Sequence, residues 1–534
     1  MFSSIGSKSA LVSPLDPLDR AAVGYVGLPL FIFIVGWFEW WAALPLAACT
    51  AYALRALFAP GPGAVPRIPV TRLQVMVALS VGCAWTVFGG TDHLVFANAD
   101  WHIRDAVLHD LVASPWPLGY GLLDGHETLL RAPLAYYLPA ALVGKSAGLP
   151  MAHMALALWT AIGASLFLLQ VLSLTPSRLG TAVLVAAIVV LFSGLDIVGS
   201  LLNDGPRFRA DWNITTHLEW WAGIYQYSSM TTQLFWVPNH ALAGWIIIGL
   251  LFRDSRAPSL LTTLPILVVA AALWSPLSAL GLVPFVLWKA GTHMFRDRNL
   301  RLLHPQVWAP ALVVGLAVGA YLALDPGAIH KGMSLGNDAP GNIAMDLLRQ
   351  AQFFLLEAGF IGLAILMIRR SGEAVLALII LAVLPFAYLG PANDLVMRAS
   401  IPSLAVLMIA ACLALVQQGE DRRDARKKLA LGALLIVGAV TPAAEFARAA
   451  MLPAWPINMA ATLIGANCGG FAPHYVARLG GEAIVHVLRP ANRLPLGPLG
   501  RESCDNPAYD LMWGDLLKTP KPHLTPLTDR LRPT

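Results

Sequence analysis

The segment 98–111, NADWHIRDAVLHDL, concentrates ionisable side chains in a chain that is otherwise mostly apolar. It holds three aspartates, one arginine and two histidines. A carboxylate near a lipid boundary can act as a general base, because desolvation raises its pKa and a neighbouring cation lowers it. Asp100 and Arg104 are spaced i, i+4, so they can pair on a helix. This segment is therefore the first candidate for a catalytic site.

A helix over 101–111 would divide these side chains between two faces, because successive residues step by about 100°. One face collects Trp101, Ile103, Val107, Leu108 and Leu111, and the other collects His102, Asp105, His109 and Asp110. We expect the helix to lie on the membrane surface with the second face in water. Asp100 and Arg104 then fall on the apolar side, where a charge is costly unless it is paired or functional.

Asp100 is the first candidate for a catalytic base, and Asp105 is the second. The alternative role for Asp100 is an N-cap that accepts backbone N–H bonds. The alternative for Asp105 and His102 is a solvated helix face. Arg104 is the candidate cation beside the base and a candidate ligand for a phosphate, while Trp101 and His102 are candidates for lining a substrate or lipid groove.

The sequence 202–245 adds cations among aromatic side chains. Arg207, Arg209 and His240 are candidates for binding a lipid phosphate, whose developing charge needs Arg, Lys or His donors at the membrane surface. The tryptophans of this loop suit sugar faces, but they equally fit the interfacial belt of any membrane protein. In the sequence VPNH, Asn239 and His240 stand at a proline-broken entry to a span, either as a polar cap or as ligand contacts.

The segment 390–402, GPANDLVMRASIP, is a short loop that carries both signs of charge. Arg398 is the first choice for a phosphate ligand, and a snorkelling interface anchor is its alternative role. Asp394 can orient Arg398 through an i, i+4 pair. Asn393 stands beside them and is a candidate for the substrate groove.

Four further residues lie close to predicted span ends. Tyr136 and Tyr137, in the juxtamembrane sequence YYLPAAL, can line a lipid groove. Asp196 and Glu357 stand near the outer ends of two predicted spans, where they can face a cavity but lie close enough to the surface to be hydrated.

No motif indicates a cofactor. His102 and His109 flank Asp105 at helical spacing, but nothing like HExxH appears in the sequence, so we expect no metal site. The sequence also lacks a Walker loop, GxGxxG and GxSxG, so nucleotide binding and a serine hydrolase are not indicated. We expect no nucleic-acid partner. Cys468 and Cys504, in the polar C-terminal part, can form a disulfide in an oxidising compartment.

The rest of the chain predicts a membrane setting for these residues. The 534 residues are 57% hydrophobic and 13% charged, and the mean hydropathy is +0.65, far from the range of soluble domains. A span needs about 20 apolar residues. Thirteen runs meet or approach this length, near 22–40, 41–57, 73–90, 151–174, 180–200, 237–252, 259–273, 276–290, 307–325, 352–369, 374–390, 400–417 and 429–447. We therefore predict an all-α polytopic membrane protein with about 13 transmembrane helices.

The basic residues predict which loops are cytoplasmic. With 133–148 taken as an interfacial or re-entrant helix, 19 of the 36 Lys and Arg residues fall on one side. Short basic loops are typical of the cytoplasmic side. The sequence therefore predicts a cytoplasmic N-terminus and an extracytoplasmic C-terminus in what we expect to be the bacterial plasma membrane. The long polar loops 91–150, 201–236 and 326–351 and the short loop 391–399 then lie outside.

The predicted organisation has four parts. Residues 1–21 form a cytoplasmic N-terminus, 22–57 a helical hairpin, 58–447 the transmembrane core, and 448–534 a loop-rich extracytoplasmic tail. The chemistry should be on the outer side, because the polar sequence is concentrated there.

The order of features over roughly 70–180 resembles the first outer loop of the GT-C glycosyltransferases, especially the branch with protein O-mannosyltransferases and the lipid A aminoarabinose transferase. An acidic residue follows an outward-going span, an amphipathic helix ends in SPWP, and RAPLAYYLPAALVGKSAG precedes a long span that closes with LTPSRLG. The chain departs from the family in having AD where many members have Asp-Glu and AP where many have Pro-Pro. It also carries the additional N-terminal hairpin.

The resemblance implies a GT-C-like fold and transfer of a sugar from a polyprenyl-phosphate donor on the outer membrane face, with inversion at the anomeric carbon. Asp100 occupies the position of the family's catalytic base. The acceptor would be a lipid, a glycan or a protein, and membrane lipids would be further partners. A transporter or lipid flippase is the main alternative, and a non-catalytic assembly subunit is a third. Ion-coupled carriers usually place charges near the bilayer midplane, whereas here the sequence places them near the outer span ends.

Overall fold

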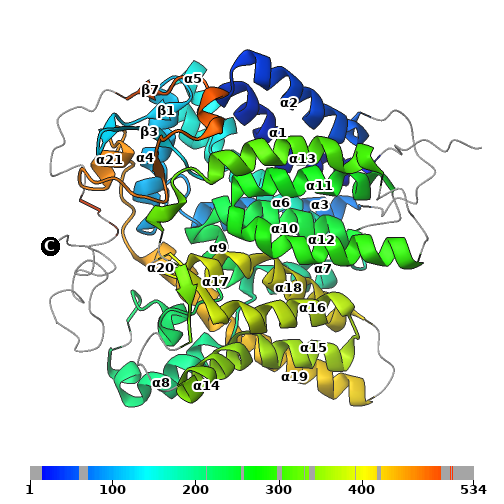
Figure 1. The fold of residues 1–534 in the computed structure, drawn as a ribbon. Helices are drawn as coiled ribbons and strands as arrows, with labels where there is room; N and C mark the ends of the chain where they lie inside the picture. Colours follow the sequence, from blue (N-terminus) through cyan, green and yellow to red (C-terminus); the bar gives the residue numbers. More distant parts are fainter. Residues whose placement is uncertain are drawn as a thin grey trace, which may run out of the picture.

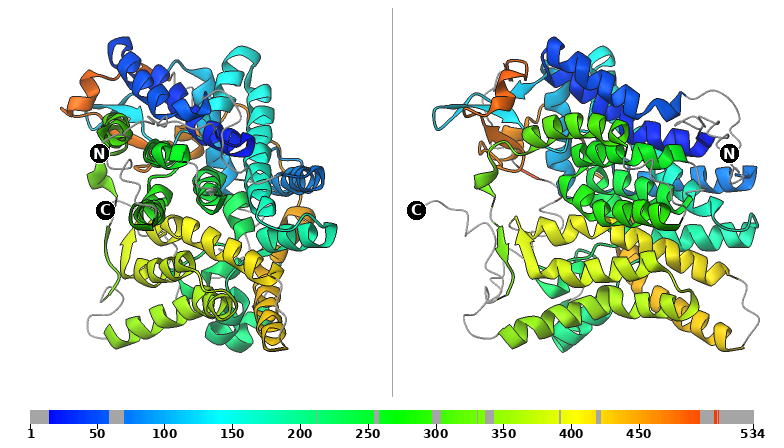
Figure 2. Two further views of the ribbon diagram at one scale, coloured as in Figure 1. Left: turned by 90° about the vertical axis from the view of Figure 1, so that its right-hand side faces the viewer. Right: turned by 45° about the vertical axis from the view of Figure 1, so that its right-hand side comes forward.

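The computed structural model describes residues 15–58, 70–211, 213–253, 258–296, 304–329, 331–335, 343–390, 392–417, 422–494, 505–506 and 508. Most of these residues are helical, and the long helices lie side by side in a bundle (Figures 1 and 2). The strands in the described residues are short and lie at one end of the bundle.

In the described part of the chain, seven helices are long and apolar enough to cross a membrane. They are α1 (Pro17–Trp37), α6 (Leu149–Ser173), Leu179–Asn203, α13 (Pro305–Leu322), Ile343–Ile368, Asp394–Val416 and Arg422–Met451. The predicted helical membrane class agrees with this architecture. The number of 13 crossings and the GT-C fold remain predictions.

Four of these seven spans contain an interruption or a junction between two elements. The element pairs are α7 (Leu179–Leu191) with α8 (Asp196–Asp211), α14 (Ile343–Phe354) with α15 (Phe360–Ile368), α17 (Asp394–Ala399) with α18 (Ile401–Val416), and α19 (Arg422–Gly438) with α20 (Val440–Met451). Backbone groups freed at such points must find partners inside the protein.

The other six predicted runs are also helical but are not among the seven. They form α2 (Trp40–Ala53), α3 (Arg72–Phe88), α10 (Pro238–Arg253), α11 (Pro258–Trp274), α12 (Pro276–Arg296) and α16 (Gly372–Val383). Proline opens α10, α11 and α12, because its missing N–H costs nothing in the first turn of a helix. A capping box between Thr71 and Gln74 starts α3.

Helix α3 runs antiparallel to α6, and α1 runs antiparallel to α10, so the bundle has two distinct ends. The Gln74 side chain at the start of α3 donates to the Leu172 carbonyl at the end of α6, at 2.7 Å. Asp19 near the start of α1 accepts from Arg253 at the end of α10, at 2.8 Å. The end that carries α4 (Asp100–Ala113) and α5 (Leu138–Ala147) is called the loop end below, and it lies on the left in Figure 1. The other is called the opposite end.

The segment 452–494 is built into the loop end. Its strand β6 (Val476–Arg478) pairs with β3 (His126–Leu130), which also pairs with β2 (Leu122–Leu123). Its strand β7 (Asn492–Arg493) pairs with β1 (Leu118–Gly119), and a separate pair joins β4 (Lys331–Met333) to β5 (Ala387–Leu389). This part of the predicted tail therefore shares sheets with the first predicted outer loop.

Helix α4 forms where the sequence predicts it, but the predicted wet face is wrong. Asp105 is 3% exposed and Asp110 is 0% exposed. The segment 452–475 covers this face: the Trp455 carbonyl contacts His93 behind Asp105, and the Leu463 N–H donates to Asp110. Helical periodicity cannot reveal this cover, because it comes from a segment some 350 residues away in the sequence.

Helix α10 runs through the centre of the protein. Every one of its residues except Phe252 is buried, so it has no polar face, as expected for a helix surrounded by others. Its first turn carries Asn239 and His240 into the interior at the loop end. The polar side chains of the VPNH sequence are thus enclosed by protein.

Candidate functional site

Asp100 and Arg104 form an ion pair at the start of α4. Arg104 Nη2 lies 3.0 Å from Asp100 Oδ2, and the side chains are 3% and 44% exposed, respectively. The same Nη2 also donates to the Trp236 carbonyl. Burial acts to lower the pKa of Arg104, but the Asp100 charge and nearby tyrosines outweigh it and the pKa is raised. The pair therefore joins a buried, charged guanidinium to an accessible carboxylate.

A second i, i+4 ion pair faces the same region. Arg398 Nη2 lies 2.9 Å from Asp394 Oδ1 on α17, and both side chains are partly buried. The charges of Arg104 and Arg398 both act on His240, and both ion pairs act on Tyr475. We call Asp100, Arg104, Asp394, Arg398 and Tyr475 the two-arginine site. Burial raises the pKa of the Tyr475 hydroxyl, which stays neutral between the two pairs.

Several buried polar atoms around the two-arginine site have no hydrogen-bond partner among the described residues. These are the Tyr137 hydroxyl, Asn239 Oδ1, both amide atoms of Asn393, and Nε of Arg104 and Arg398. A buried polar group left without a partner costs about 1–3 kcal/mol. Such groups are rare in folded proteins, and their concentration here is what a binding site for a polar ligand requires.

Backbone and side-chain contacts hold these groups in place. Asn393 adopts the left-handed conformation, with φ 53°, directly before α17. His240 Nδ1 lies 2.9 Å from the Ser275 hydroxyl, at the junction between α11 and α12. Burial raises the pKa of Tyr137, so its hydroxyl remains a donor.

Other predicted groove residues are packed inside the protein. The Trp101 indole N–H lies 3.1 Å from the carbonyls of Gly89 and Phe235. The Tyr136 hydroxyl lies 2.7 Å from the Thr160 hydroxyl. Both side chains are fully buried, and His102 is nearly so. Their observed contacts are with the protein core.

Three predicted residues fall wholly or partly outside the described structure. Arg207 and Arg209 lie on the backbone of α8 beyond the kink at Gly205, and their side chains are not described. Cys504 is outside the described residues, so the predicted Cys468–Cys504 disulfide is not tested.

Sequence reasoning missed a histidine pair that encloses Asp105. His93 Nε2 lies 2.9 Å from Asp105 Oδ2, and His153 Nδ1 lies 3.8 Å from Oδ1. His93 Nδ1 faces the Trp455 carbonyl at 3.0 Å. His93 precedes α4, and His153 lies in the first turns of α6. No local spacing links them to Asp105, because the contact is tertiary.

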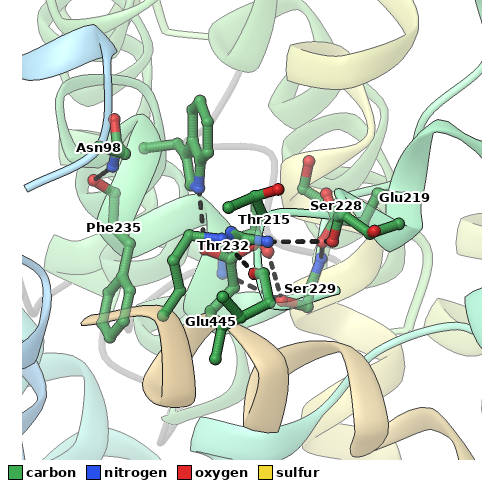
Figure 3. Close-up of polar contacts among 12 residues, drawn as sticks. Asn98, Thr215, Glu219, Ser228, Ser229, Thr232, Phe235 and Glu445 are labelled. Atoms are coloured by element: carbon green, nitrogen blue, oxygen red, sulfur yellow. Dashed lines mark hydrogen bonds and ion pairs between the residues drawn. The ribbon is translucent and has the colours of Figure 1, made fainter. Parts of the chain in front are cut away.

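A buried polar network behind the two-arginine site was also missed (Figure 3). Glu219 accepts from the Ser229 N–H at 2.8 Å and from Gln226 at 2.7 Å. Glu445 accepts from the Trp236 indole at 3.0 Å and pairs with Arg448 at 2.6 Å. Burial raises the pKa of Glu219 to about 8. The Trp236 residue links this network to Arg104, since its carbonyl accepts from that guanidinium.

A cavity of about 180 Å³ lies far from these groups. Its lining includes Lys289, Arg369 and Glu373 with Leu251 and Phe285. Lys289 lies near the end of α12, whereas the start of α12 is at the loop end beside Ser275. The cavity is therefore at the opposite end of the bundle.

The described residues contain no group of three or more His, Cys, Asp or Glu side chains placed to hold a metal ion. Comparison with known proteins gives no match: no family model, curated protein or solved structure is significantly similar to this chain. The resemblance of residues 70–180 to the GT-C glycosyltransferases therefore stays a prediction, and the case for a function comes from the site geometry.

Proposed function

We propose that this protein is an integral membrane glycosyltransferase that moves a sugar from a polyprenyl-phosphate donor to an acceptor hydroxyl. The observation that carries the proposal is the Asp100–Arg104 pair, in which an accessible carboxylate is held beside a buried guanidinium. Arg398 supplies a second cation acting on the same region. A base beside two anion-binding groups is what transfer from a phosphate donor needs.

In the proposed step, Asp100 takes the proton of the acceptor hydroxyl. Arg104 holds Oδ2 of Asp100 and leaves Oδ1 for that proton. The acceptor oxygen forms a bond to the anomeric carbon from one side as the bond to the phosphate oxygen breaks on the other. The electron pair of the broken bond stays on the polyprenyl phosphate, and the sugar is inverted.

The two arginines would receive the departing phosphate. Each guanidinium keeps N–H groups free of the ion pair, and Nε of each has no partner among the described residues. Charge-assisted hydrogen bonds from Arg to phosphate are roughly twice as strong as neutral ones. The Tyr137 hydroxyl and the Asn239 and Asn393 amides offer further polar contacts for a sugar or phosphate.

Asp105 suits the role of base less well than Asp100. It is 3% exposed and enclosed by His93 and His153. An acceptor hydroxyl must come within about 3 Å of a general base, and the accessible Asp100 side chain allows that approach. Asp105 is better placed to stabilise the packing of the protein around α4.

The test is transfer by the purified full chain from a panel of polyprenyl-phosphate sugars to lipid, glycan and peptide acceptors. We expect Asp100→Asn to lower turnover by about 10²–10⁴-fold, because a positioned base contributes that much, while donor binding is retained. Asp124→Asn is the matched control, since Asp124 is an exposed loop aspartate at the same end of the bundle. Unchanged turnover in Asp100→Asn contradicts the proposal.

A transporter is the second candidate function, and one observation favours it. Asp196 and Glu357, expected to be hydrated, are 1% and 2% exposed instead, within spans that are interrupted beside them. Buried ionisable groups at broken membrane helices are a feature of ion-coupled carriers. Liposomes distinguish the two functions: a transporter moves its labelled substrate across the membrane unchanged, whereas a transferase yields a new glycosidic bond.

A further inference from the structure

Two buried carboxyl groups meet where two membrane spans leave regular α-helical geometry. Residues 192–195 separate α7 from α8, and Asp196 is the first residue of α8. Glu357 lies in the π-helical turn Leu355–Gly359, between α14 and α15. π-Helical turns are rare and often mark functional sites. The Leu195 N–H donates to the Leu356 carbonyl at 3.1 Å, so the two interruptions are bonded to each other.

The two carboxyl groups are neighbours that interact directly with each other. One oxygen of each is already satisfied: Asp196 Oδ2 accepts from the Ser193 and Thr441 hydroxyls, both at 2.8 Å, and Glu357 Oε1 accepts from the Trp221 indole at 2.7 Å. Asp196 Oδ1 and Glu357 Oε2 are buried, and no donor among the described residues reaches them.

The packing keeps the pair together. A Cβ atom at Gly194 would overlap Glu357 Oε2, and one at Gly438 would lie 2.7 Å from the Ser193 carbonyl. Only glycine therefore allows the interrupted backbone to approach Glu357 this closely. This packing holds the backbone just before Asp196 against Glu357.

The charged groups packed around the pair do not neutralise it. Among the described residues, Glu219 and Tyr227 are titratable groups that interact with the pair, and Glu219 is itself acidic. Glu445, on α20, is paired with Arg448, whose guanidinium also donates to the Ile214 and Thr216 carbonyls. Both hydroxyl groups and the indole at the pair are neutral. Two carboxylates in contact cannot both stay ionised in such surroundings.

We propose that Asp196 and Glu357 hold one proton between them and form a proton-binding site inside the bundle. The shared proton supplies the missing donor between Asp196 Oδ1 and Glu357 Oε2. It also leaves the pair with one negative charge, which the Ser193, Thr441 and Trp221 donors stabilise. The inference does not depend on the function proposed above, because neither residue belongs to the two-arginine site.

Infrared spectroscopy of the full chain in nanodiscs tests this at pH 7, because a protonated carboxyl group has a carbonyl band that a carboxylate lacks. We expect the protonated-carboxyl band of Asp196→Asn to be weaker than that of the parent by the contribution of one carboxyl group. The band of Glu357→Gln should be weaker by the same amount. Glu445→Gln is the matched control and should leave the band unchanged, since Glu445 is ionised beside Arg448. Glu219→Gln is measured in parallel to identify any share from that residue.

Several outcomes would overturn the proposal. One is a parent chain without any protonated-carboxyl band beyond the share of Glu219, a result that needs no variant to fold. Another is an undiminished band in Asp196→Asn and Glu357→Gln. A third concerns the thermal unfolding midpoint. If the midpoint of the parent rises with Na⁺ but not with choline, and that of Asp196→Asn does not respond to Na⁺, the pair binds a monovalent cation instead of a proton.

Discussion

Two aspartates five residues apart on one helix have different roles because their surroundings differ. Asp100 is accessible and contacts one guanidinium, whereas Asp105 is enclosed between two histidines and pairs with His93. Both ring nitrogens of His93 face acceptors, Asp105 on one side and the Trp455 carbonyl on the other. These contacts hold Asp105 inside the protein, which suits a structural role better than contact with a substrate.

Arg398 provides the sharpest residue-scale test of donor binding. We expect Arg398→Gln to lower kcat/KM for a polyprenyl-phosphate sugar by about 10–100-fold, because a hydrogen bond to a charged group contributes about 1.5–3 kcal/mol. Steady-state transfer assays would measure this. Arg493→Gln is the control, since Arg493 is an exposed arginine at the loop end paired with Glu127. Equal effects of the two substitutions would count against a phosphate role for Arg398.

The pKa of Glu219 predicts a pH dependence of stability. Burial raises this pKa to about 8, so the folded protein binds more protons than the unfolded chain above the ordinary Glu value of about 4.3. Stability is therefore lost as pH rises towards 8, by at most about 1.4 kcal/mol per pH unit.

Between pH 6.5 and 8 this loss of stability does not overlap with the titration of His217, because burial lowers the pKa of His217 to about 4 and its contribution to stability changes only below pH 6.5. We expect thermal unfolding midpoints of Glu219→Gln to change less over this range than those of the parent. Parallel pH profiles of parent and variant would show that Glu219 does not titrate there.

At the scale of elements, α4 is held by the C-terminal segment that covers it. Asp110 Oδ2 accepts from the Tyr120 hydroxyl at 2.9 Å and from the Leu463 N–H at 2.8 Å. Leu463 is the first residue of α21 (Leu463–Ala466). Burial raises the pKa of Asp110, and these hydrogen bonds oppose the shift. One carboxylate thus joins three segments of the loop end.

We expect Asp110→Leu to loosen the segment 452–475 over α4. The substitution leaves two buried donors unpaired, at about 1–3 kcal/mol each. Hydrogen–deuterium exchange should increase in 452–475 and in α4, and much less in α10. Exchange that rises evenly over the whole chain, or not at all, would show that Asp110 does not fasten this segment.

The elements themselves were largely predictable, and their partners were not. Each of the thirteen apolar runs contains a helix, and the i, i+4 spacing of Asp100 with Arg104 and of Asp394 with Arg398 matches observed ion pairs. The predicted wet face of α4 and the predicted hydration of Asp196 were wrong, because both depend on segments distant in sequence. Sequence periodicity predicts the faces of a single helix, whereas the burial of each face depends on every segment that packs against that helix.

At the scale of the whole molecule, the candidate chemistry and the basic loops lie at different ends of the bundle. The two-arginine site is at the loop end, and Arg369 and Arg370 follow α15 at the opposite end. The positive-inside rule then predicts that the loop end lies outside the cell.

Cysteine labelling would test this orientation. In a cysteine-free background we expect Asp124→Cys to react with a membrane-impermeant maleimide in intact cells, because Asp124 is exposed at the loop end. Arg370→Cys, exposed at the opposite end, should react only after permeabilisation. The reverse pattern would remove the basis for an extracytoplasmic glycosyl transfer.

The pairing of β3 with β6 joins residues near 128 to residues near 477. A ribosome delivers the first of these strands long before the second, and every membrane helix from α6 to α20 is made in between. The first loop must therefore wait, incompletely folded, until nearly the whole chain has been inserted. A nascent protein halted before 452 would carry Asp100 and Arg104 but lack Tyr475 and the cover over α4, so the site would mature as one of the last events of biogenesis.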